Sequence, residues 1–380
     1  MNSHLEPRLV ADVGRTMIRI GLTDNSGHLN HNSVREYDPQ LQPTISSSIS
    51  AYAKDCGLGG LPRRAALAVS GLPRGETISI TNSRWILSRS GLTAMFGAEP
   101  LIINDFAANA WAIGSSRSAG RIGAFGTRIV QPDKPGTYCI IGMGSGLGVA
   151  ALTRDRHGFV HVVPTEAGHM AMMDGLPINP AVLKQLREKG IPSGEMLLSG
   201  PGLLRIHSAV RSVAGGGREY SSSREMLNPA AHKTDPTIKE ALNVFATAFW
   251  YFAGNIVLAY GAWDGLILTG SIPAQTRAIL EQADVRRHFF ISGPYARRLA
   301  EVPVGTASYR YAELEGAAVA LLVDEVHKAF KDPASARLAD SPKASVSTLF
   351  SPGAQNDTWA SGPPAPGGAS WHQSRRPACA

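Results

Sequence analysis

The 380-residue chain contains only three cysteines, Cys56, Cys139 and Cys379. Cysteines so few, odd in number and far apart do not form a disulfide framework, and the lack of a Cys-x-x-Cys pair argues against zinc. The first residues lack the basic stretch and apolar run of a secretory signal peptide. No segment approaches the roughly 18 uninterrupted apolar residues of a membrane-spanning helix. These absences predict a cytoplasmic protein that does not enter a membrane.

Long runs of like charge are also missing. The formal net charge is +7, but the basic residues are scattered, and no run of five or more occurs. A positive surface of this kind attracts small anions as readily as it attracts a phosphodiester backbone. We therefore expect no specific nucleic-acid partner.

Apolar residues are scarce only at the C-terminal end. Hydrophobic residues make up 43% of the whole chain and charged residues 18%, which is ordinary for a globular protein. Residues 331–380, in contrast, contain 7 Pro, 4 Gly and 8 Ser but only four large aliphatic or Phe side chains. So few apolar groups do not offset the entropy of ordering this segment. The sequence predicts about two domains over roughly the first 330 residues, followed by a disordered tail.

Two segments share the pattern of strand, turn of small residues and strand. Residues 10–23 read VADVGRTMIRIGLT, and residues 140–153 read IIGMGSGLGVAALT. Apolar residues flank a glycine-containing turn in both, which is typical of a hairpin, and Thr16 and Ser145 occupy comparable places. The repeat predicts a duplicated architecture in which each copy begins one lobe.

Strands and helices alternate along the rest of the chain. Apolar runs predict strands at residues 64–72, 101–103, 157–163 and 266–268. Helical patterns predict helices at 106–113, 181–189, 203–213, 238–259, from 273 onward, and at 312–328. This alternation predicts an α/β protein whose sheets are covered by helices.

Glycines occupy alternate positions from Gly142 to Gly148. Such a turn exposes successive backbone N–H groups that can cradle phosphate oxygens. Alternatively, the glycines allow a bulged or tightly packed strand. The run does not end in Gly-Lys-Ser/Thr and it opens a strand, so it is not a P-loop and does not favour a Rossmann turn. The matching first hairpin favours phosphate binding.

Two acidic residues stand at or near the ends of apolar strands. Asp12 lies inside an apolar strand, where a carboxylate either faces a nucleotide-bound Mg²⁺ through water or caps turn amides. Asn104-Asp105 follows three apolar residues and begins a helix. Ligands in α/β proteins bind at the carboxyl ends of strands. Asp105 is therefore either the helix N-cap or a general base that takes a proton from a hydroxyl nucleophile.

A further polar group follows the second hairpin. Glu166 and His169 lie three residues apart in a loop that also contains Pro164 and Gly168, and Glu195 comes shortly before a second glycine-rich segment. Carboxylates and an imidazole together suit a ligand with several hydroxyl groups. Solvated loop side chains and a zinc site without a nearby cysteine are the alternatives, and the residues alone leave them open.

In this order, the segments resemble the bacterial-type ATP-dependent glucokinase family, which has the actin/hexokinase/Hsp70 fold. The resemblance covers residues 8–328 and rests on DVGRT (12–16) with Arg19, TNSRW (81–85), IINDF (102–106), GMGSGLGVA (142–150), EAGH (166–169), EMLLSGPGL (195–203), AGN (253–255) and LTGSIP (268–273). The cysteine-rich zinc motif of the other large bacterial sugar-kinase family is absent.

The resemblance implies an α/β, two-lobed actin-like ATPase (ribonuclease H-like) fold, with a mixed sheet covered by helices in each lobe and a cleft between them. It implies a small lobe at residues 8–115, a large lobe at 116–311 and a C-terminal helix at 312–330 that returns to the small lobe. The disordered tail at 331–380 lies beyond the region of resemblance.

The resemblance also implies transfer of the γ-phosphate of ATP, carried with Mg²⁺, to the 6-hydroxyl of glucose, with Asp105 as general base. The implied sugar-binding residues are Asn82, Asn104, Asp105, Glu166, His169 and Glu195. The implied nucleotide-binding residues are Asp12, Gly14, Arg15, Thr16, Gly142, Gly144, Ser145, Gly146, Thr269 and Gly270. We expect no metal held by protein side chains, and the family implies a homodimer.

The first turn departs from the family pattern Asp-x-Gly-Gly-Thr-Asn. Arg15 stands in place of the second glycine and Met17 in place of the Asn. If the glycine has positive φ, arginine there costs about 1–2 kcal/mol, and its side chain competes for phosphate space. Turned inward, the guanidinium instead pairs with phosphate oxygens. Two hypotheses follow, an active glucokinase and a glucose-binding pseudokinase or sensor with impaired phosphoryl transfer.

Overall fold

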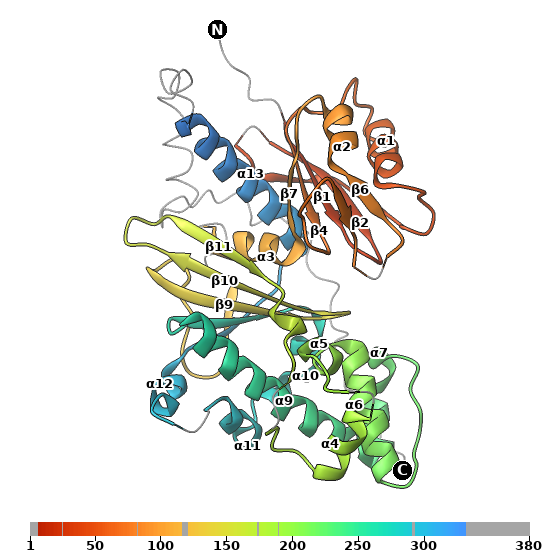
Figure 1. The fold of residues 1–380 in the computed structure, drawn as a ribbon, viewed down its shortest axis with the longest axis vertical. Helices are drawn as coiled ribbons and strands as arrows, with labels where there is room; N and C mark the ends of the chain where they lie inside the picture. The colour runs from red at the N-terminus through yellow and green to blue at the C-terminus, as the bar shows by residue number, and fades with distance from the viewer. Residues whose placement is uncertain are drawn as a thin grey trace, which may run out of the picture.

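The computed structural model describes residues 7–331, apart from residues 25, 82, 116–120, 173–174, 189 and 291–292. The expected sugar-binding residue Asn82 and the expected tail beyond Lys331 therefore lie outside the described residues. Two large sheets, one in each lobe, form the framework, and helices pack against them (Figure 1). The α/β class and the two-lobed architecture are confirmed.

The first lobe contains a five-stranded sheet in the order β3-β2-β1-β4-β7. Its strands are β1 (Leu9–Val13), β2 (Ile18–Thr23), β3 (Leu29–Tyr37), β4 (Ala65–Val69) and β7 (Leu101–Asn104). β1 pairs antiparallel with β2 and parallel with β4, so it lies in the middle of the sheet. The apolar pattern predicted the β1–β2 hairpin and β4, and both are confirmed.

The central strand β1 is buried on both faces. Leu9 and its odd-numbered neighbours pack against α1 (Ile45–Asp55) and α2 (Arg89–Phe96), whereas Val10 packs against α13 (Ala312–Lys331). Side chains alternate between the faces of a strand. Asp12 therefore shares the face of Val10, on the side of α13.

The second lobe contains a six-stranded sheet in the order β11-β10-β9-β12-β13-β8. Its strands are β8 (Ile122–Ala124), β9 (Gly136–Met143), β10 (Leu147–Arg154), β11 (Val160–Thr165), β12 (Gly265–Thr269) and β13 (Val304–Ala307). In both sheets, three antiparallel strands continue into two parallel ones. This shared topology confirms the duplication that the two hairpins predict.

Two helices, α3 (Asp105–Gly114) and α13, lie between the sheets (Figure 1). Leu314 of α13 packs in one cluster with Val10 of the first sheet, and Val319 of α13 packs in another with Ile140 of the second. Because the helix pair is common to both cores, α13 does not belong to the small lobe alone. The residue limits of the lobes stay a prediction.

The largest helix of the second lobe is α9 (Pro236–Tyr260), which packs against α6 (Gly200–Val213). It is long and apolar enough to cross a membrane by length and composition, but 72% of its most apolar window is buried inside the protein. Phe245, Phe249 and Trp250 are fully buried, and the indole N–H of Trp250 donates to the carbonyl of Leu280 at 2.9 Å. The helix supplies much of the core of this lobe.

The other described elements connect and cover the lobes. They are β5 (Thr77–Ser79) paired with β6 (Ile86–Ser88), η2 (Ala167–His169), α4 (Pro180–Arg187), α5 (Gly194–Leu197), α7 (Ser223–Met226), α8 (Pro229–Thr234), α10 (Ser271–Leu280), α11 (Ala283–Arg286), η3 (Arg287–Phe289) and α12 (Ala296–Glu301).

Several element boundaries differ from the sequence prediction by a few residues, and two of them have a clear local cause. β11 begins at Val160 instead of residue 157, because Asp155 accepts backbone N–H groups of His157 and Phe159 and closes a turn first. α6 begins at Gly200 instead of residue 203, because the hydroxyl of Ser199 caps it by accepting the N–H of Gly202 at 3.1 Å. Local side-chain hydrogen bonds set both starts.

Candidate active site

Asp105 occupies the first position of α3, directly after the carboxyl end of β7. The N-cap of α3 is Asn104, whose Oδ1 accepts the backbone N–H groups of Phe106 at 2.9 Å and Ala107 at 3.0 Å. The alternative that Asp105 is the N-cap is therefore wrong, because its neighbour already caps the helix. The carboxylate of Asp105 accepts the N–H of Phe106 at 2.8 Å through Oδ1, which leaves Oδ2 for other partners.

The carboxyl group of Asp105 has its pKa raised to about 6. Burial is the main cause, and the negative charges of Glu313 and Glu166 also raise the pKa, while hydrogen bonds from Phe106 and Ser70 lower it. A general base is most effective when its pKa lies near the working pH. Asp105 is ionised near neutral pH and accepts a proton more readily than an ordinary aspartate.

Asp12 is the more deeply buried acid of the site, with 6% of its surface exposed, whereas Asp105 is partly exposed. Its Oδ2 accepts a hydrogen bond from Arg19 of β2 at 2.9 Å. Burial raises the pKa of Asp12 well above its usual value and the charge of Glu313 raises it further, whereas Arg19 lowers it. The partner of Asp12 is thus a guanidinium on the neighbouring strand.

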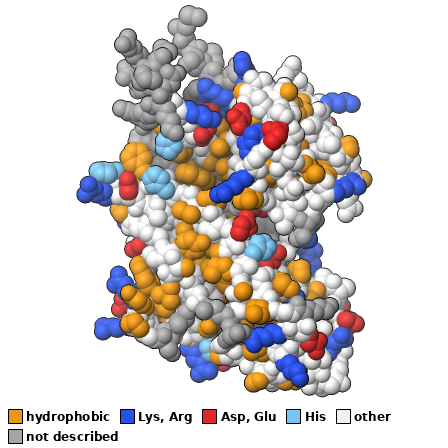
Figure 2. Space-filling view, in the orientation of Figure 1, with side chains coloured by type: hydrophobic (Ala, Val, Ile, Leu, Met, Phe, Trp, Pro, Cys, Tyr) orange, Lys and Arg blue, Asp and Glu red, His pale blue; other side chains and the backbone are white. Residues whose placement is uncertain are grey.

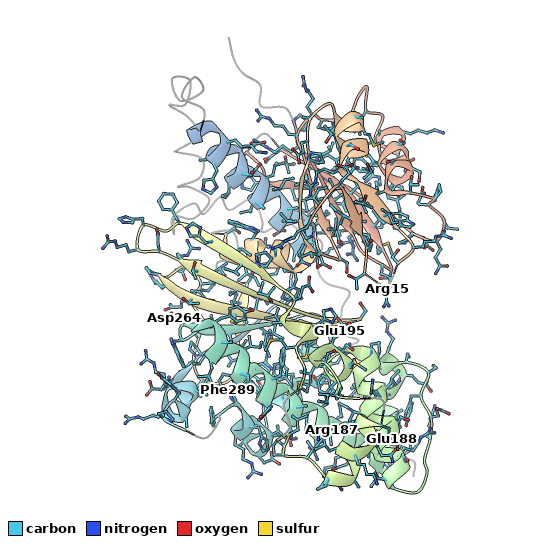
Figure 3. The ribbon with its side chains drawn as sticks, in the orientation of Figure 1. Arg15, Arg187, Glu188, Glu195, Asp264 and Phe289 are labelled. Atoms are coloured by element: carbon cyan, nitrogen blue, oxygen red, sulfur yellow. The ribbon has the colours of Figure 1, made fainter. Side chains whose placement is uncertain are left out.

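The first glycine turn is closed tightly between β1 and β2. The N–H of Gly14 donates to the carbonyl of Met17 at 3.1 Å, and a Cβ at Gly14 would lie 3.0 Å from that oxygen. Arg15 and Thr16 are exposed at the tip of the turn. Figure 3 shows Arg15 at the edge of the first lobe that faces the second lobe. Its guanidinium is therefore placed to meet a ligand between the lobes.

The second glycine turn is shorter than the run of glycines from Gly142 to Gly148 suggests. Gly142 and Gly148 pair with each other inside β9 and β10. A Cβ on either glycine would lie 2.3 Å from the ring of Phe106, so these two positions serve close packing. The turn itself comprises residues 144–146, and Gly144 accepts the N–H of Gly200, at the start of α6, at 2.8 Å.

Glu195, in α5, lies against the second turn. Its Oε2 accepts the backbone N–H of Leu147 at 3.0 Å, and a Cβ at Gly146 would lie 2.7 Å from the same oxygen. The carboxylate expected to bind sugar is therefore also connected to the turn expected to bind phosphate. Figure 3 shows Glu195 on the second lobe, at the side that faces Arg15.

Glu166 directly precedes the short η2 turn and His169 is its last residue, with the imidazole Nε2 3.9 Å from the carboxylate Oε2. Both side chains are about half exposed. The charge of Glu166 acts on Asp105, so this loop faces the start of α3. An exposed acid and imidazole beside a buried acid suit the recognition of hydroxyl groups.

Thr269 ends β12 beside the second hairpin, and Gly270 is the N-cap of α10. Thr269 pairs with Gly142 of β9. Gly270 has a φ of 95°, and a Cβ there would lie 2.3 Å from the carbonyl oxygen of Met143. Glycine is required at this position for both reasons, and it brings the start of α10 close to the second glycine turn.

The expected site residues form two adjoining groups. Asp12, Asp105 and Glu166 belong to one group, since the charge of Asp105 acts on Asp12 and that of Glu166 acts on Asp105. The turn 144–146 lies with Glu195 and Gly270 in the other group. In Figure 2, acidic and histidine side chains lie along the junction between the lobes on the viewed face. Phe106, the neighbour of Asp105, packs against Gly142 and Gly148 of the second hairpin, so the two groups adjoin.

Asn104 is less available than the sequence suggests. Its Oδ1 caps α3, and its Nδ2 donates to the carbonyl of Gly71 at 3.3 Å. The Nδ2 group carries two hydrogens, and the one that does not point to Gly71 can donate to a sugar hydroxyl.

Two site residues were not predicted from the sequence. Glu313 lies in the first turn of α13, where its charge acts on both Asp12 and Asp105. Asn109 of α3 donates to Glu313 at 3.1 Å. An acid in the first turn of a helix is ordinary, so the sequence carries no signal that distinguishes Glu313 from Glu315.

Elsewhere in the second lobe, a cavity of about 680 Å³ lies between α4, α6 and residues 215–216. Arg205 and Arg211 line it, but each already donates to a backbone carbonyl near the end of a helix. Glu188 marks this end of the lobe in Figure 3, away from Glu195. The cavity contains none of the expected site residues.

Comparison with known proteins identifies the family and the fold. The model of the glucokinase family matches residues 9–323. A glucokinase of Stenotrophomonas maltophilia (strain R551-3) is 36% identical over 324 residues, which is 84% of this chain and 96% of that protein. The solved structure of a glucokinase from an Antarctic psychrotroph has a TM-score of 0.68 at 26% identity, over 83% of this chain and 98% of that one.

A more distant structure shares the fold. A ROK-family glucokinase from Streptomyces griseus, solved in complex with glucose and AMPPNP, has a TM-score of 0.55 at 19% identity, over 82% of this chain and 98% of that one. The fold and these relatives thus place the protein in the class of two-lobed hexose kinases. Within that class, the chain belongs to the glucokinase family.

Proposed function

We propose that the protein transfers the γ-phosphoryl group of ATP to the 6-hydroxyl of glucose, with Asp105 as general base. The observation that carries this proposal is the state of Asp105, which does not cap α3, lies at the carboxyl end of a strand and has a pKa of about 6. The sugar oxygen attacks the γ-phosphorus as its proton passes to Asp105. The bond from that phosphorus to the bridging oxygen breaks, and ADP leaves.

Sugar recognition falls to the polar groups around Asp105. The half-exposed Glu166 and His169 and the carboxylate of Glu195 supply acceptors and donors for hydroxyl groups, and Asn104 supplies one N–H. Asn82 is included on the family resemblance alone. A site built to pair with several hydroxyls rejects analogues that lack them, because its polar groups would then be buried without partners.

Nucleotide binding falls to the two turns and the end of β12. The N–H groups of Ser145 and Gly146 in the second turn, and of Ser271 at the start of α10, suit phosphate oxygens. The N–H of Gly144 instead donates to the carbonyl of Gly146 at 3.0 Å and holds the turn closed. Gly14, Arg15 and Thr16 approach from the first lobe, Gly142 supports the second turn from within β9, and Thr269 and Gly270 approach the adenosine.

ATP is expected as its Mg²⁺ complex. The three acids Asp12, Asp105 and Glu313 outnumber the guanidinium of Arg19, so a polyanionic nucleotide requires a cation at this end of the site. Mg²⁺ carried by the nucleotide would supply that charge, with Asp12 facing it through water. Among the residues that the structure describes, no group of three or more His, Cys, Asp or Glu is arranged to hold a metal by itself.

We further propose that the lobes close over glucose and exclude water, which protects ATP from hydrolysis. The protein is expected to act in the cytoplasm as a homodimer, on glucose and ATP, without nucleic acid or membrane as a partner. The few, dispersed cysteines and the scattered charge support the compartment and the small-molecule partners.

A coupled assay of glucose 6-phosphate formation with Mg-ATP tests the activity. We expect turnover within the usual range for kinases, about 1–100 s⁻¹. Asp105→Ala should abolish turnover while the fold and ATP binding, the latter measured by calorimetry, largely persist. Asp284→Ala, at an exposed position of α11, is the matched control and should keep wild-type activity. Survival of activity in Asp105→Ala would show that the base is another residue.

A second candidate is a glucose-binding pseudokinase or sensor, which the altered first turn favours. Turnover below about 10⁻³ s⁻¹ beside normal glucose binding would select it over a kinase. The double variant Arg15→Gly/Met17→Asn tests whether these two residues weaken the binding of ATP by the first turn. We expect a lower KM for ATP in the double variant, with glucose affinity unchanged. An equal KM would show that the turn accepts both substitutions.

A further inference from the structure

The side chain of Asn109 joins Glu313 to the first turn of α3. Its Nδ2 donates to Oε1 of Glu313 at 3.1 Å and lies 3.4 Å from the backbone carbonyl oxygen of Asp105, to which it also donates. Asn109 is 7% exposed and Glu313 is half-buried. A buried amide thus holds a carboxylate next to the backbone of Asp105, although 204 residues separate the two partners in sequence.

The packing of α13 on α3 fixes where this carboxylate lies. Gly316 is one turn after Glu313, so both are on the same side of the helix. A Cβ at Gly316 would lie 1.7 Å from the carbonyl oxygen of Ala108, the residue before Asn109. The helices therefore touch through their backbones at this point, and Glu313 has little freedom to move away from α3.

The charged groups that face Asp105 come from four other elements. Asp12 extends from β1 on the face of α13, Arg19 from β2 pairs with it, Glu166 follows β11, and Glu313 lies on α13. After burial, the charge of Glu313 is the largest influence that raises the pKa of Asp105, and the same is true of Asp12. Arg19 offsets part of this negative charge at Asp12.

We propose that Glu313 is a positioning residue for phosphoryl transfer, which acts through Asp105: Asn109 holds the Glu313 carboxylate beside the first turn of α3, and the close contact of α13 with α3 keeps its negative charge near the Asp105 carboxylate. Glu313 does not touch the sugar or the phosphate in this role. The inference rests on the proposed function of Asp105, and it adds a residue from the last helix to the chemistry of the site.

The test is the pH profile of kcat for wild type and Glu313→Gln at saturating glucose and Mg-ATP. Removal of the charge should move the midpoint of the acidic limb about one pH unit lower, by the size of a single like-charge interaction at short range. The plateau at high pH should fall a few-fold, because a weaker base accepts the proton less readily. A merely structural role would lower kcat at every pH and leave the midpoint in place, which would overturn the proposal.

Two further variants control for folding. Glu315→Gln removes a charge from the same helix but at a side chain that pairs with Arg121 and His31, so it should leave the midpoint unchanged. Glu313→Asp keeps the charge and should return the midpoint towards wild type. If Glu313→Asp behaves like Glu313→Gln, or if Glu315→Gln shifts the midpoint equally, the charge of Glu313 is not the cause.

A second measurement separates this inference from the proposed function. Carboxyl carbon NMR of the protein, with the signal of Asp105 identified by its loss in Asp105→Asn, reports its pKa without turnover. A pKa lowered in Glu313→Gln supports the inference even if the wild type proves inactive. An unchanged pKa rejects it even if the wild type is an active kinase with Asp105 as base.

Discussion

At the scale of single residues, the site places like charges together in a buried setting. Asp105 and Asp12 both have raised pKa values, and burial is the first cause in each. Ionisation of such groups costs the folded protein free energy that the unfolded chain does not lose. We therefore expect the ionised acids to lower the free energy of unfolding, and the size of this loss to depend on pH.

The replacement Asp105→Asn should expose that cost. The pKa of Asp105 rises from 3.8 to about 6 on folding, so the stability linked to its protonated form is present below pH 4 and lost as the pH rises through 6. The variant should thus raise Tm by a few degrees at pH 8 and change it little at pH 4. Thermal unfolding at both pH values measures this. An equal change at the two pH values would mean that the charge of Asp105 is not the cause.

Some residues of the candidate site can be identified from the sequence and others cannot. Asp105 is identifiable because it follows an apolar strand and begins a helix, and those features are local. That Asn104 caps this helix was not predictable, since either residue of the pair suits the position. Glu313 was not predictable at all, because its role depends on the register between α3 and α13, and 204 residues separate it from Asn109.

At the scale of elements, the helix pair α3 and α13 has the largest influence on the site. α3 carries Asp105 at its start, and its Phe106 ring supports the second hairpin beneath Gly142 and Gly148. α13 covers the face of β1 that carries Asp12. The close contact at Gly316 therefore sets the distance between acids from different parts of the chain.

The replacement Gly316→Ala should disturb this contact. The added methyl would lie 1.7 Å from the carbonyl oxygen of Ala108, which cannot move without α3. We expect a loss of about 1–3 kcal/mol in the free energy of unfolding, together with reduced kcat, measured by urea unfolding and the coupled assay. Gly59→Ala is the control, since nothing lies within 4 Å of a Cβ there and no positive φ is involved. Wild-type stability in Gly316→Ala would contradict the close contact.

Elements with a clear apolar pattern were predictable and irregular ones were not. The two hairpins, β4, β7, α9 and α13 follow from runs or periodic spacing of apolar residues. β3 escapes this reasoning because its residues, LNHNSVREY, are mostly polar and partly exposed. β8 has only three residues, too few for any period to show.

At the scale of the whole molecule, the last helix, α13, contacts the segment just before the first strand, β1. Arg8, just before β1, donates to both carboxylate oxygens of Glu325 in α13, at 2.8 to 3.2 Å. The arginine side chain is 3% exposed, and breaking a buried pair of this kind is costly. The last helix is thereby joined to the first strand, and both cores are complete with α13 in place.

Removal of the residues after 335 should therefore leave kcat, KM and Tm unchanged. The segment beyond is poor in large apolar side chains, and the family match ends at residue 323. A second truncation after residue 311 is the matched contrast: it removes Glu313, Gly316 and the apolar face of α13, which packs into both cores, and should leave no folded enzyme. Kinase assay and thermal unfolding of the two truncated chains measure the difference. A large loss in the first truncation would show that the tail contributes to the fold or to the site, against the composition from which its role was inferred.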